Sequence, residues 1–556
     1  MSKQRYLLFL ALLLCVLSMA NALSYRMGTD AYSPDQQPPQ DSIIYLLHSD
    51  VLSFDQKKNP DAQLLKGNVV FRHHGAFMYC DSANYYQASN SFEAFDHVKM
   101  KQGDTLTLVG DYLFYDGNMQ LCVIRGNVIL THRKTRLLTD SLNYDRLYDL
   151  GYFMEGGVLE DEENVLTSDW GEYSPSTKEA LFNYNVKLVN PNFTLTTDTL
   201  HYNTDTDIAH FTGPSNVDSD NNHIYSESGY YNTKTEDANL VQRSVLVNPE
   251  RRLVGDSVTY NKATGQGEGF GNVIITNLKD KNMLVGDYCY YNDSTGTALA
   301  TGRAVAKDFS QEGADTLYMH ADSLRMYSYN LETDSLYRVI HAYRKARVYR
   351  TDIQAVSDSI VYNQKDSCLT MYFMPIVWNN DMQLTGERIM VWNNDSTIRR
   401  AHVQNQAMSV ERLDSIHYNQ IAGKDIYAYF DEEGEIKQSD VVGNVEFAYY
   451  PLEKDSTLTM MHTGTCSELR FYRKNRKVER IWGGSSFNAT GYPIEMIPAN
   501  KMQLPNFKWM DYIRPKDKDD IFNWKERRSE DVMEALPERK APMVNLKDIK
   551  PKREGR

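Results

Sequence analysis

The sequence predicts an all-β fold in which short strands build an elongated, solenoid-like stack of repeats. The first observation is a phrase with an acidic residue, an apolar residue two positions later and usually a tyrosine four positions later, as in DSLNY at Asp140 and DSVTY at Asp256. It recurs from Asp50 to Glu468, mostly with a period of about 29 residues, which is typical of one supersecondary unit stacked many times. The second observation is period-2 alternation of apolar and polar residues, and the third is that no sustained helical periodicity occurs between residues 43 and 500.

Each repeat is predicted to supply two or three strands that have one apolar face. In LLTDSLNY, the residues Leu138, Asp140 and Leu142 have the same parity, so we expect them to share one face of a strand. A second phrase, Gly-Asn-Val followed by alternating apolar residues, closes many repeats, as in GNVIL at Gly126 and GNVII at Gly271. Glycine is expected there at a bend or bulge where the chain enters the strand.

The recurrent acidic residues need a structural role, because stacked carboxylates repel one another unless they are solvated or hydrogen-bonded. We expect each acid at a strand bend, where it accepts hydrogen bonds from backbone N–H groups. A ladder of metal ions is an alternative, but the sequence lacks the G-G-x-G-x-D pattern of calcium-binding rolls, and we predict neither a metal nor a cofactor. The acids given this structural role are Asp81, Asp111, Asp140, Asp169, Asp198, Asp256 and Asp287.

Composition excludes some partners and indicates the state of the cysteines. The net charge of −14 and the isoelectric point near 5.5 argue against nucleic acid as a partner, because phosphate binding needs a basic face. The five cysteines beyond the N-terminal segment occupy different places in their repeats, so isolated core residues are favoured over a disulfide framework. They are Cys80, Cys122, Cys289, Cys368 and Cys466.

The first 22 residues predict a secretory signal peptide that is cleaved after Ala22. Lys3 and Arg5 form a basic start, and residues 7–17 form an apolar core that is too short to span a bilayer. An N-terminal membrane anchor is the alternative. Residues 23–42 are predicted to be a linker, and the later sequence contains no stretch of about 18 uncharged apolar residues.

Three further regions follow the linker. Residues 43–310 are predicted to hold regular repeats, residues 311–500 more divergent repeats, and residues 501–556 a charged C-terminal extension that is irregular or partly disordered. The extension begins with an aromatic cluster that could cap the last strand or dock a partner, and we expect the rest to be mobile. The cluster comprises Phe507, Trp509, Tyr512 and Ile513.

Two other motifs are given structural interpretations. The glycine-rich segment 265–271 has the look of a phosphate-binding loop, but it precedes a strand and Glu268 would repel phosphate, so a flexible turn is predicted. The His73-His74 pair is predicted to lie on the surface of a strand. No pair of acids is singled out for acid–base catalysis, although residues distant in sequence could meet in space.

The alternation of the two phrases in a secreted all-β chain resembles the OstA-like family. This is the LptA family of lipopolysaccharide-transport proteins, also found as the periplasmic part of LptD. The best-matching segments are GNVVF…CDSANYY, GNVIL…TDSLNYD and GNVII…GDYCYYN, and the resemblance covers residues 43–310 well and 311–500 loosely. It implies a β-jellyroll, a V-shaped pair of sheets with an apolar inner groove, that stacks end to end and carries lipopolysaccharide. The chain is longer than a single jellyroll and has a C-terminal extension, which leaves open whether it replaces the short bridge protein or acts beside it.

The resemblance and the residue pattern together predict a non-enzymatic protein in the periplasm of a Gram-negative bacterium, with the outer membrane as a candidate site of association. Its expected ligand is lipopolysaccharide, held by the acyl chains of lipid A, and its expected partners are other lipopolysaccharide-transport proteins joined through end-to-end β-strand pairing. The residues predicted to line the groove are Val69, Phe71, Val98, Met100, Leu113, Val128, Leu130, Leu142, Val186, Leu188, Leu200, Val258, Val273 and Ile275.

A closed core has the same sequence pattern as a lined groove, so two other classes of function stay open. One is a secreted β-solenoid that binds or processes polysaccharide. The other is a structural surface repeat protein.

Overall fold

The computed structural model describes residues 42–531, apart from residues 56, 58–59, 220–221, 248, 250, 280, 310–314, 332, 395–397, 452–456 and 475–476. The predicted signal peptide, nearly all of the predicted linker and residues 532–556 lie outside the described residues. The chain divides into two compact units, Met1–Phe153 (unit 1) and Met154–Arg556 (unit 2). The predicted boundary at residue 310 stays a prediction.

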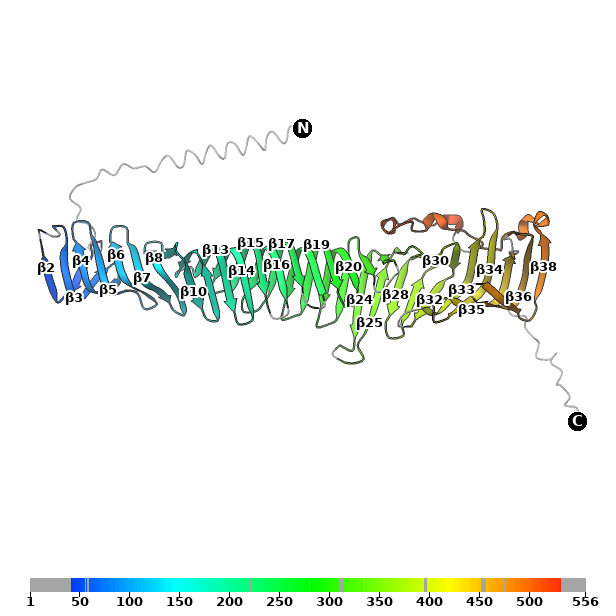
Figure 1. The fold of residues 1–556 in the computed structure, drawn as a ribbon, viewed down its shortest axis with the longest axis horizontal. Coiled ribbons are helices and arrows are strands. Elements are labelled where there is room, and N and C mark those ends of the chain that lie inside the picture. Colours follow the sequence, from blue (N-terminus) through cyan, green and yellow to red (C-terminus); the bar gives the residue numbers. More distant parts are fainter. Residues whose placement is uncertain are drawn as a thin grey trace, which may run out of the picture. The chain divides into compact units, whose positions relative to one another are not determined.

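Unit 1 consists of antiparallel strands that pair mostly in chain order (Figure 1). The strands are β1 (Tyr45–His48), β2 (Val51–Phe54), β3 (Gln63–His73), β4 (Ala76–Tyr86), β5 (Ser91–Gln102), β6 (Leu106–Asp116), β7 (Leu121–His132), β8 (Thr135–Asp145) and β9 (Leu150–Phe153).

Unit 2 begins with three short strands, β10 to β12, continues with long strands and then again has shorter strands. The first group is β10 (Gly157–Asp161), β11 (Asn164–Ser168), β12 (Trp170–Ser174), β13 (Glu179–Asn190), β14 (Phe193–Asn203), β15 (Ile208–Asp218), β16 (His223–Asn232), β17 (Ala238–Val247), β18 (Arg251–Asn261), β19 (Gln266–Asn277) and β20 (Asn282–Asn292). The shorter strands are β21 (Thr297–Thr301), β22 (Val305–Asp308), β23 (Leu317–His320), β24 (Ser323–Tyr329), β25 (Tyr337–Tyr343), β26 (Ala346–Tyr349), β27 (Ile353–Ser357), β28 (Ser359–Asn363), β29 (Cys368–Tyr372), β30 (Ile376–Asn379), β31 (Met382–Thr385) and β32 (Arg388–Asn393).

Unit 2 ends with long strands and five short 3-10 helices. The strands are β33 (Ile398–Arg412), β34 (Tyr418–Phe430), β35 (Ile436–Tyr449), β36 (Met460–Lys474), β37 (Lys477–Gly483) and β38 (Asn488–Pro493). The 3-10 helices are η1 (Ile494–Met496), η2 (Ala499–Lys501), η3 (Asp511–Ile513), η4 (Asp520–Phe522) and η5 (Ser529–Asp531). Strands dominate both units, so the predicted all-β fold is confirmed. Within the part of the chain that the structure describes, no helix is long and apolar enough to cross a membrane.

A bulge, usually of two residues, interrupts every second long strand near its middle. In β7 the bulge is Gly126 (φ +77°) and Asn127 (φ +47°), and the register with β8 shifts between Arg125 and Val128. Asp140 of β8 lies opposite this bulge. Left-handed residues in a bulge bend the strand. The glycine of the Gly-Asn-Val phrase therefore lies at a bend, as predicted, but in the middle of a strand and not at its entry.

The bend places the two halves of each strand in two layers that face each other. In unit 1 the first layer comprises 63–66, 82–86, 91–95, 112–116, 121–125 and 141–145, and the second layer comprises 69–73, 76–79, 98–102, 106–109, 128–132 and 135–139. Phe71 of the second layer stacks on Phe92 of the first, with ring centroids 4.2 Å apart. The sulfur atoms of Met100, in the second layer, and Cys122, in the first, are 3.7 Å apart. These contacts join strands that are not neighbours, so the core lies between the layers.

The same arrangement is present in unit 2. The bulge of β13 at Tyr184 and Asn185 separates the first-layer half 179–183 from the second-layer half 186–190. From β21 to β32 the bulge is replaced by a break, so the halves become separate short strands such as β21 and β22. Phe193 of the second layer contacts Tyr231 of the first, with ring centroids 4.8 Å apart.

The bulges also change which positions of a strand are buried. In β8, Leu137 and Thr139 precede Asp140 and are buried, whereas Leu142 follows Asp140 by two positions and is also buried. Leu138 is only partly buried, and Asp140 is exposed. The prediction that Leu138, Asp140 and Leu142 share one face is therefore wrong, because the alternation shifts by one residue at the acid.

The recurrent acids are exposed and lie beside the bulge of the next strand. Asp111 of β6 accepts a hydrogen bond of 2.7 Å from the Nδ2 atom of Asn127. His97 takes the place of the asparagine beside Asp81, at 2.8 Å, and this hydrogen bond raises the pKa of His97. Equivalent contacts join Asn185 to Asp169 and Asn272 to Asp256, while Asp198 lies against Gly213 and Asp287 against Gly302. In the four hydrogen-bonded contacts the donors are side chains and not the expected backbone N–H groups. A stabilising role of the acids at the bend stays a prediction.

Gly126→Ala is expected to destabilise unit 1 by about 1–3 kcal/mol. A Cβ atom at Gly126 would lie 2.6 Å from the Oδ2 atom of Asp111, in addition to the strain of a left-handed backbone. Gly75 has a similar φ of +75°, and no atom lies within 4 Å of its Cβ position, so Gly75→Ala is the matched control for backbone strain alone. Urea unfolding of both variants measures the difference. Equal destabilisation would show that the acid imposes no steric requirement at the bulge.

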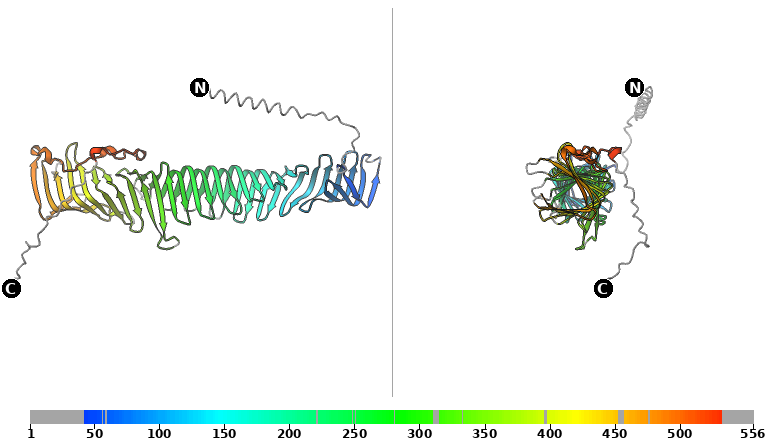
Figure 2. Two further views of the ribbon diagram at one scale, coloured as in Figure 1. Left: turned by 180° about the vertical axis from the view of Figure 1, so that it is seen from behind. Right: turned by 90° about the vertical axis from the view of Figure 1, so that its right-hand side faces the viewer.

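The described part of the C-terminal extension packs on the outer face of unit 2 against strands between β23 and β36 (Figures 1 and 2, orange to red). Ile513 is fully buried in a cluster with Trp378. The side chain of Gln383 accepts a hydrogen bond from the backbone N–H of Met510 at 2.8 Å. The expectation of a mobile extension is therefore wrong for residues 501–531, because apolar burial and buried hydrogen bonds hold this segment.

The five cysteines named above are buried and unpaired with one another. Burial raises the pKa of the Cys122 thiol and of the Cys289 thiol to about 12 in each case. Both thiols are therefore neutral and unreactive at neutral pH. The interpretation of these cysteines as isolated core residues is confirmed.

Candidate functional site

In each unit a row of apolar side chains runs along the inner face of the second layer, and we call this row the apolar ladder. Each member lies directly opposite the next one across neighbouring strands. In unit 1 the ladder is Phe71, Met78, Met100, Leu108, Leu130 and Leu137. In unit 2 it is Leu159, Leu166, Leu188, Leu195, Val217, Ile224, Leu246, Leu253, Ile275, Leu284, Ala306, Met319, Val348 and Ala355.

The exposure of the ladder changes along unit 2. All the ladder residues of unit 1 are at most 1% exposed, and in unit 2 burial continues from Leu159 at 1% to Val217 at 4%. From Ile224 to Met319 every member is partly exposed, and burial returns at Val348. The two layers therefore leave seven consecutive inward-facing positions incompletely covered, Ile224, Leu246, Leu253, Ile275, Leu284, Ala306 and Met319, which we call the open stretch.

The inner face of the first layer carries small side chains opposite the open stretch. In unit 1 the corresponding row is Leu65, Ala83, Ala94, Leu113, Ile124 and Leu142. In unit 2 the row continues as Leu240, Val258, Gly269, Cys289, Ala300, Leu324 and Ala342. Gly269, Cys289 and Ala300 are three consecutive small members of this row in the region where the ladder is partly exposed.

The glycine-rich segment 265–271 belongs to this small-residue region. It forms most of the first-layer half of β19, so the predicted flexible turn is wrong. A Cβ atom at Gly269 would lie 2.9 Å from Cγ1 of Val273, and Gly267 lies directly beneath the ring of Tyr291. Burial raises the pKa of Tyr291 to about 12, so the phenol is neutral at neutral pH. The space of the missing Gly267 and Gly269 side chains is thus taken by the Tyr291 ring and by Val273.

Polar side chains join the free ends of the two layers in unit 1, and we call this line of contact the seam. Arg146, only 7% exposed, donates a hydrogen bond of 2.7 Å to the hydroxyl of Tyr115 and one of 3.0 Å to Gln102. The Nδ1 atom of His73 lies 2.7 Å from the same hydroxyl. His73 is fully buried, so its predicted surface position is wrong. Burial raises the pKa of Tyr115, which keeps the hydroxyl neutral.

A second seam network covers the buried part of the ladder in unit 2. The hydroxyl of Tyr202 donates to Asp161 at 3.1 Å and accepts from Asn164 at 3.0 Å. Asn164 also accepts from Asn190 at 2.9 Å and donates to Thr233 at 3.3 Å. Burial raises the pKa of Tyr202. The ladder residues from Leu159 to Val217 lie in the stretch that this network closes, and the open stretch begins beside it.

The structure places the predicted groove-lining residues in the interior between the layers. Val69, Phe71, Val98, Met100, Leu113, Val128, Leu130, Leu142, Val186, Leu188, Leu200, Val258 and Val273 are at most 3% exposed, and Ile275 is partly exposed. Whether they line a lipid groove stays a prediction.

Other members of the open stretch were missed from the sequence. Leu253 and Leu284 precede the acid of their strands by three residues, at the same spacing as the buried Leu137. This spacing is the signal that could have identified them.

Among the described residues, no group of three or more His, Cys, Asp or Glu side chains is arranged to hold a metal ion.

The comparison with family models decides the assignment of the first half of the chain. A model described as OstA-like protein matches residues 41–198 and 192–256. Residues 41–256 belong to the OstA-like family. The OstA-like region contains all of unit 1 that the structure describes and the part of unit 2 in which the ladder passes from buried to partly exposed.

One solved structure and the curated proteins complete the comparison. LptH from Pseudomonas aeruginosa, the LptA-homologous periplasmic component of the conserved lipopolysaccharide transport device, is 14% identical and covers 22% of this chain and 81% of its own. The TM-score is 0.19, so this likeness adds nothing to the OstA-like match. No curated protein matches the chain.

Proposed function

We propose that the protein is a non-enzymatic carrier of lipopolysaccharide in the periplasm of a Gram-negative bacterium, part of the transport of this lipid to the outer membrane. The acyl chains of lipid A lie between the two layers in the open stretch of unit 2. The observation that carries this proposal is the run of partly exposed ladder residues opposite small side chains. The OstA-like assignment of residues 41–256 supports it independently.

The energetic requirement explains why a carrier needs such an interior. Exposing one CH₂ group to water costs about 0.8 kcal/mol, so a chain of about 14 carbons costs on the order of 10 kcal/mol. Ile275 and Leu284 offer partly exposed apolar surface to such a chain. No charged group of catalytic type is needed for this activity.

The N-terminal edge of unit 1 supports the proposed partners. In β2 the side chains of Val51, Leu52 and Phe54 are 53%, 54% and 57% exposed. Exposed apolar side chains on an edge strand favour strand addition by another β-protein. We propose that this edge pairs end to end with another lipopolysaccharide-transport protein.

Site-specific photo-crosslinking tests the proposed lipid site. A crosslinking residue at Leu284, on the inner face, is expected to form adducts in cells that make lipopolysaccharide, whereas the same residue at the neighbouring outward position Met283 is not. Absence of lipid adducts at Leu284 and at Ile275 would refute the proposal.

The closed packing of unit 1 favours one alternative function, a structural repeat protein with a filled core. The same experiment separates the two, because a filled core gives adducts only with protein at Leu284. A crosslinking residue at Leu142, which is fully buried in unit 1, reports whether the seam opens during transport.

A further inference from the structure

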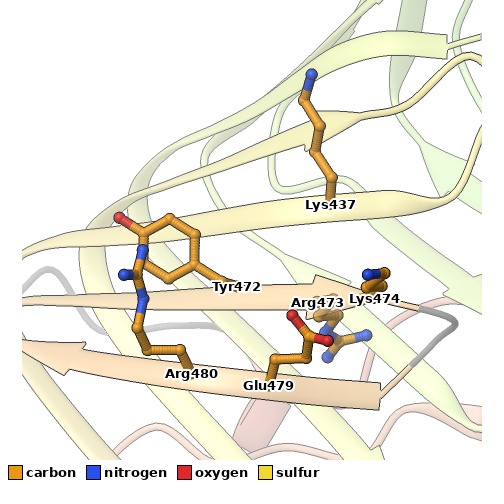
Figure 3. A pocket seen from close by; sticks show the side chains of 6 residues that line it. All are labelled: Lys437, Tyr472, Arg473, Lys474, Glu479 and Arg480. Carbon is orange, nitrogen blue, oxygen red and sulfur yellow. The ribbon is translucent and has the colours of Figure 1, made fainter.

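We propose that the C-terminal end of unit 2 binds an anionic lipid surface through a basic hollow. The hollow has a volume of about 670 Å³ and lies over the β36–β37 hairpin and the neighbouring strand β35 (Figure 3). Its lining residues are Lys437, Tyr472, Arg473, Lys474, Glu479 and Arg480.

The charge of the hollow is opposite to that of the whole chain. Four of its lining residues are cationic and one is anionic, whereas the protein carries a net charge of −14. The Nε atom of Arg473 is buried and has no hydrogen-bond partner among the described residues. A buried guanidinium nitrogen without an acceptor is costly, and a phosphate oxygen would provide that acceptor.

One of the cations is held in place by an aromatic ring. The guanidinium carbon of Arg480 lies 4.0 Å from the centre of the Tyr472 ring, and Figure 3 shows the two side chains beside each other on neighbouring strands. This contact limits the rotamers of Arg480, so less side-chain entropy is lost when an anion binds.

An exposed aromatic side chain beside the hollow favours a lipid surface over a soluble anion or an acidic protein. Trp482 follows Arg480 by two positions in β37, so the two side chains share one face of the strand, and Trp482 is 45% exposed. Arg470 lies over the Trp482 ring at 4.9 Å. Tryptophan next to arginine and lysine is typical of segments at the boundary between lipid headgroups and acyl chains.

Co-sedimentation of the full chain with vesicles tests this proposal. Binding is expected to vesicles of phosphatidylcholine mixed with phosphatidylglycerol, to weaken with salt, and to be much weaker with phosphatidylcholine alone. The double variant Arg473→Gln, Lys474→Gln is expected to bind the mixed vesicles roughly 25-fold more weakly, since each cation near an anionic surface is worth roughly fivefold. The control Lys99→Gln, Lys101→Gln removes the same charge from β5 and is expected to bind like the wild type.

Three results would overturn the proposal. The first is equal binding to both kinds of vesicle, and the second is unchanged vesicle binding of the double variant. The third is binding of inorganic phosphate in calorimetry without any binding of vesicles, because the hollow would then be a site for a soluble anion. If the double variant does not fold, Lys437→Gln, an exposed position, is expected to weaken vesicle binding roughly fivefold. The proposal does not depend on acyl chains between the layers. Vesicle binding tests the hollow and crosslinking at Leu284 tests the proposed lipid site, so either proposal can fail alone.

Discussion

Ile275→Asp is expected to abolish binding of lipopolysaccharide while the protein keeps its fold. Ile275 is a partly exposed member of the open stretch, so a carboxylate at this position stays hydrated in the free protein. An acyl chain beside it would remove that water, and an unpaired desolvated charge costs several kcal/mol. At about 1.4 kcal/mol for each tenfold change, binding of labelled lipopolysaccharide is expected to weaken by about a hundredfold or more.

Two comparison variants make this expectation specific to the open stretch. Leu188→Asp changes the same ladder where it is fully buried, so the carboxylate cannot reach water and we expect loss of about 3–5 kcal/mol of stability. Thr276→Asp adds the same charge one residue further along β19, on the outer face, and is expected to change neither binding nor stability. Fluorescence titration and thermal unfolding of all variants measure the two effects. Wild-type affinity in Ile275→Asp, with the control intact, would contradict a lipid site in the open stretch.

The inward positions next to the recurrent phrases could be predicted from the sequence because they depend only on local alternation. Val128 follows Gly-Asn by one residue, and Leu142 follows Asp140 by two, and both are at most 1% exposed. The same alternation fails for Leu138, because the bulge of the neighbouring strand shifts the register. A shift of one residue moves a side chain to the opposite face of a strand.

The seam and the open stretch could not be predicted because they depend on contacts between distant residues. Arg146 donates a hydrogen bond to the backbone carbonyl of His74, which lies 72 residues earlier in the chain. The partial exposure of Leu284 depends on the residues opposite it in the other layer, and no local pattern reports that exposure. The small residues Gly269, Cys289 and Ala300 are visible in the sequence, but their alignment in one row requires the strand register.

Gln383→Glu is expected to release the C-terminal segment from unit 2. Gln383 is 1% exposed, accepts a hydrogen bond from the N–H of Met510 and donates one of 2.6 Å to the carbonyl of Lys508. A glutamate has the same shape but lacks the donor, so its buried carboxylate would face a carbonyl oxygen. Leaving such a charge unpaired costs about 3–5 kcal/mol, which is enough to detach a segment held by a few buried side chains such as Ile513.

Limited proteolysis and hydrogen exchange of residues 499–531 measure this release. Gln364→Glu is the matched control, because Gln364 is exposed and its Oε1 atom only accepts a hydrogen bond, from the N–H of Arg338, a role that a carboxylate retains. If Gln383→Glu leaves the segment as protected as in the control, the hydrogen bonds of Gln383 do not hold it.

The effect of Gln383→Glu is expected to shrink as the pH is lowered toward about 5, because burial raises the pKa of the introduced carboxyl above its usual value of about 4.3. The folded state then binds a proton that the unfolded state does not bind, so stability falls as the pH rises through the folded pKa. The protonated carboxyl can donate to the carbonyl of Lys508 as the glutamine does.

Gln420 holds another part of the C-terminal segment in the same way as Gln383. It accepts a hydrogen bond from the N–H of Leu504 at 2.8 Å and donates one to the carbonyl of Met502 at 2.7 Å. We therefore expect the same pH dependence for Gln420→Glu. The two variants together are expected to free the whole segment, because each glutamine holds a different part of it.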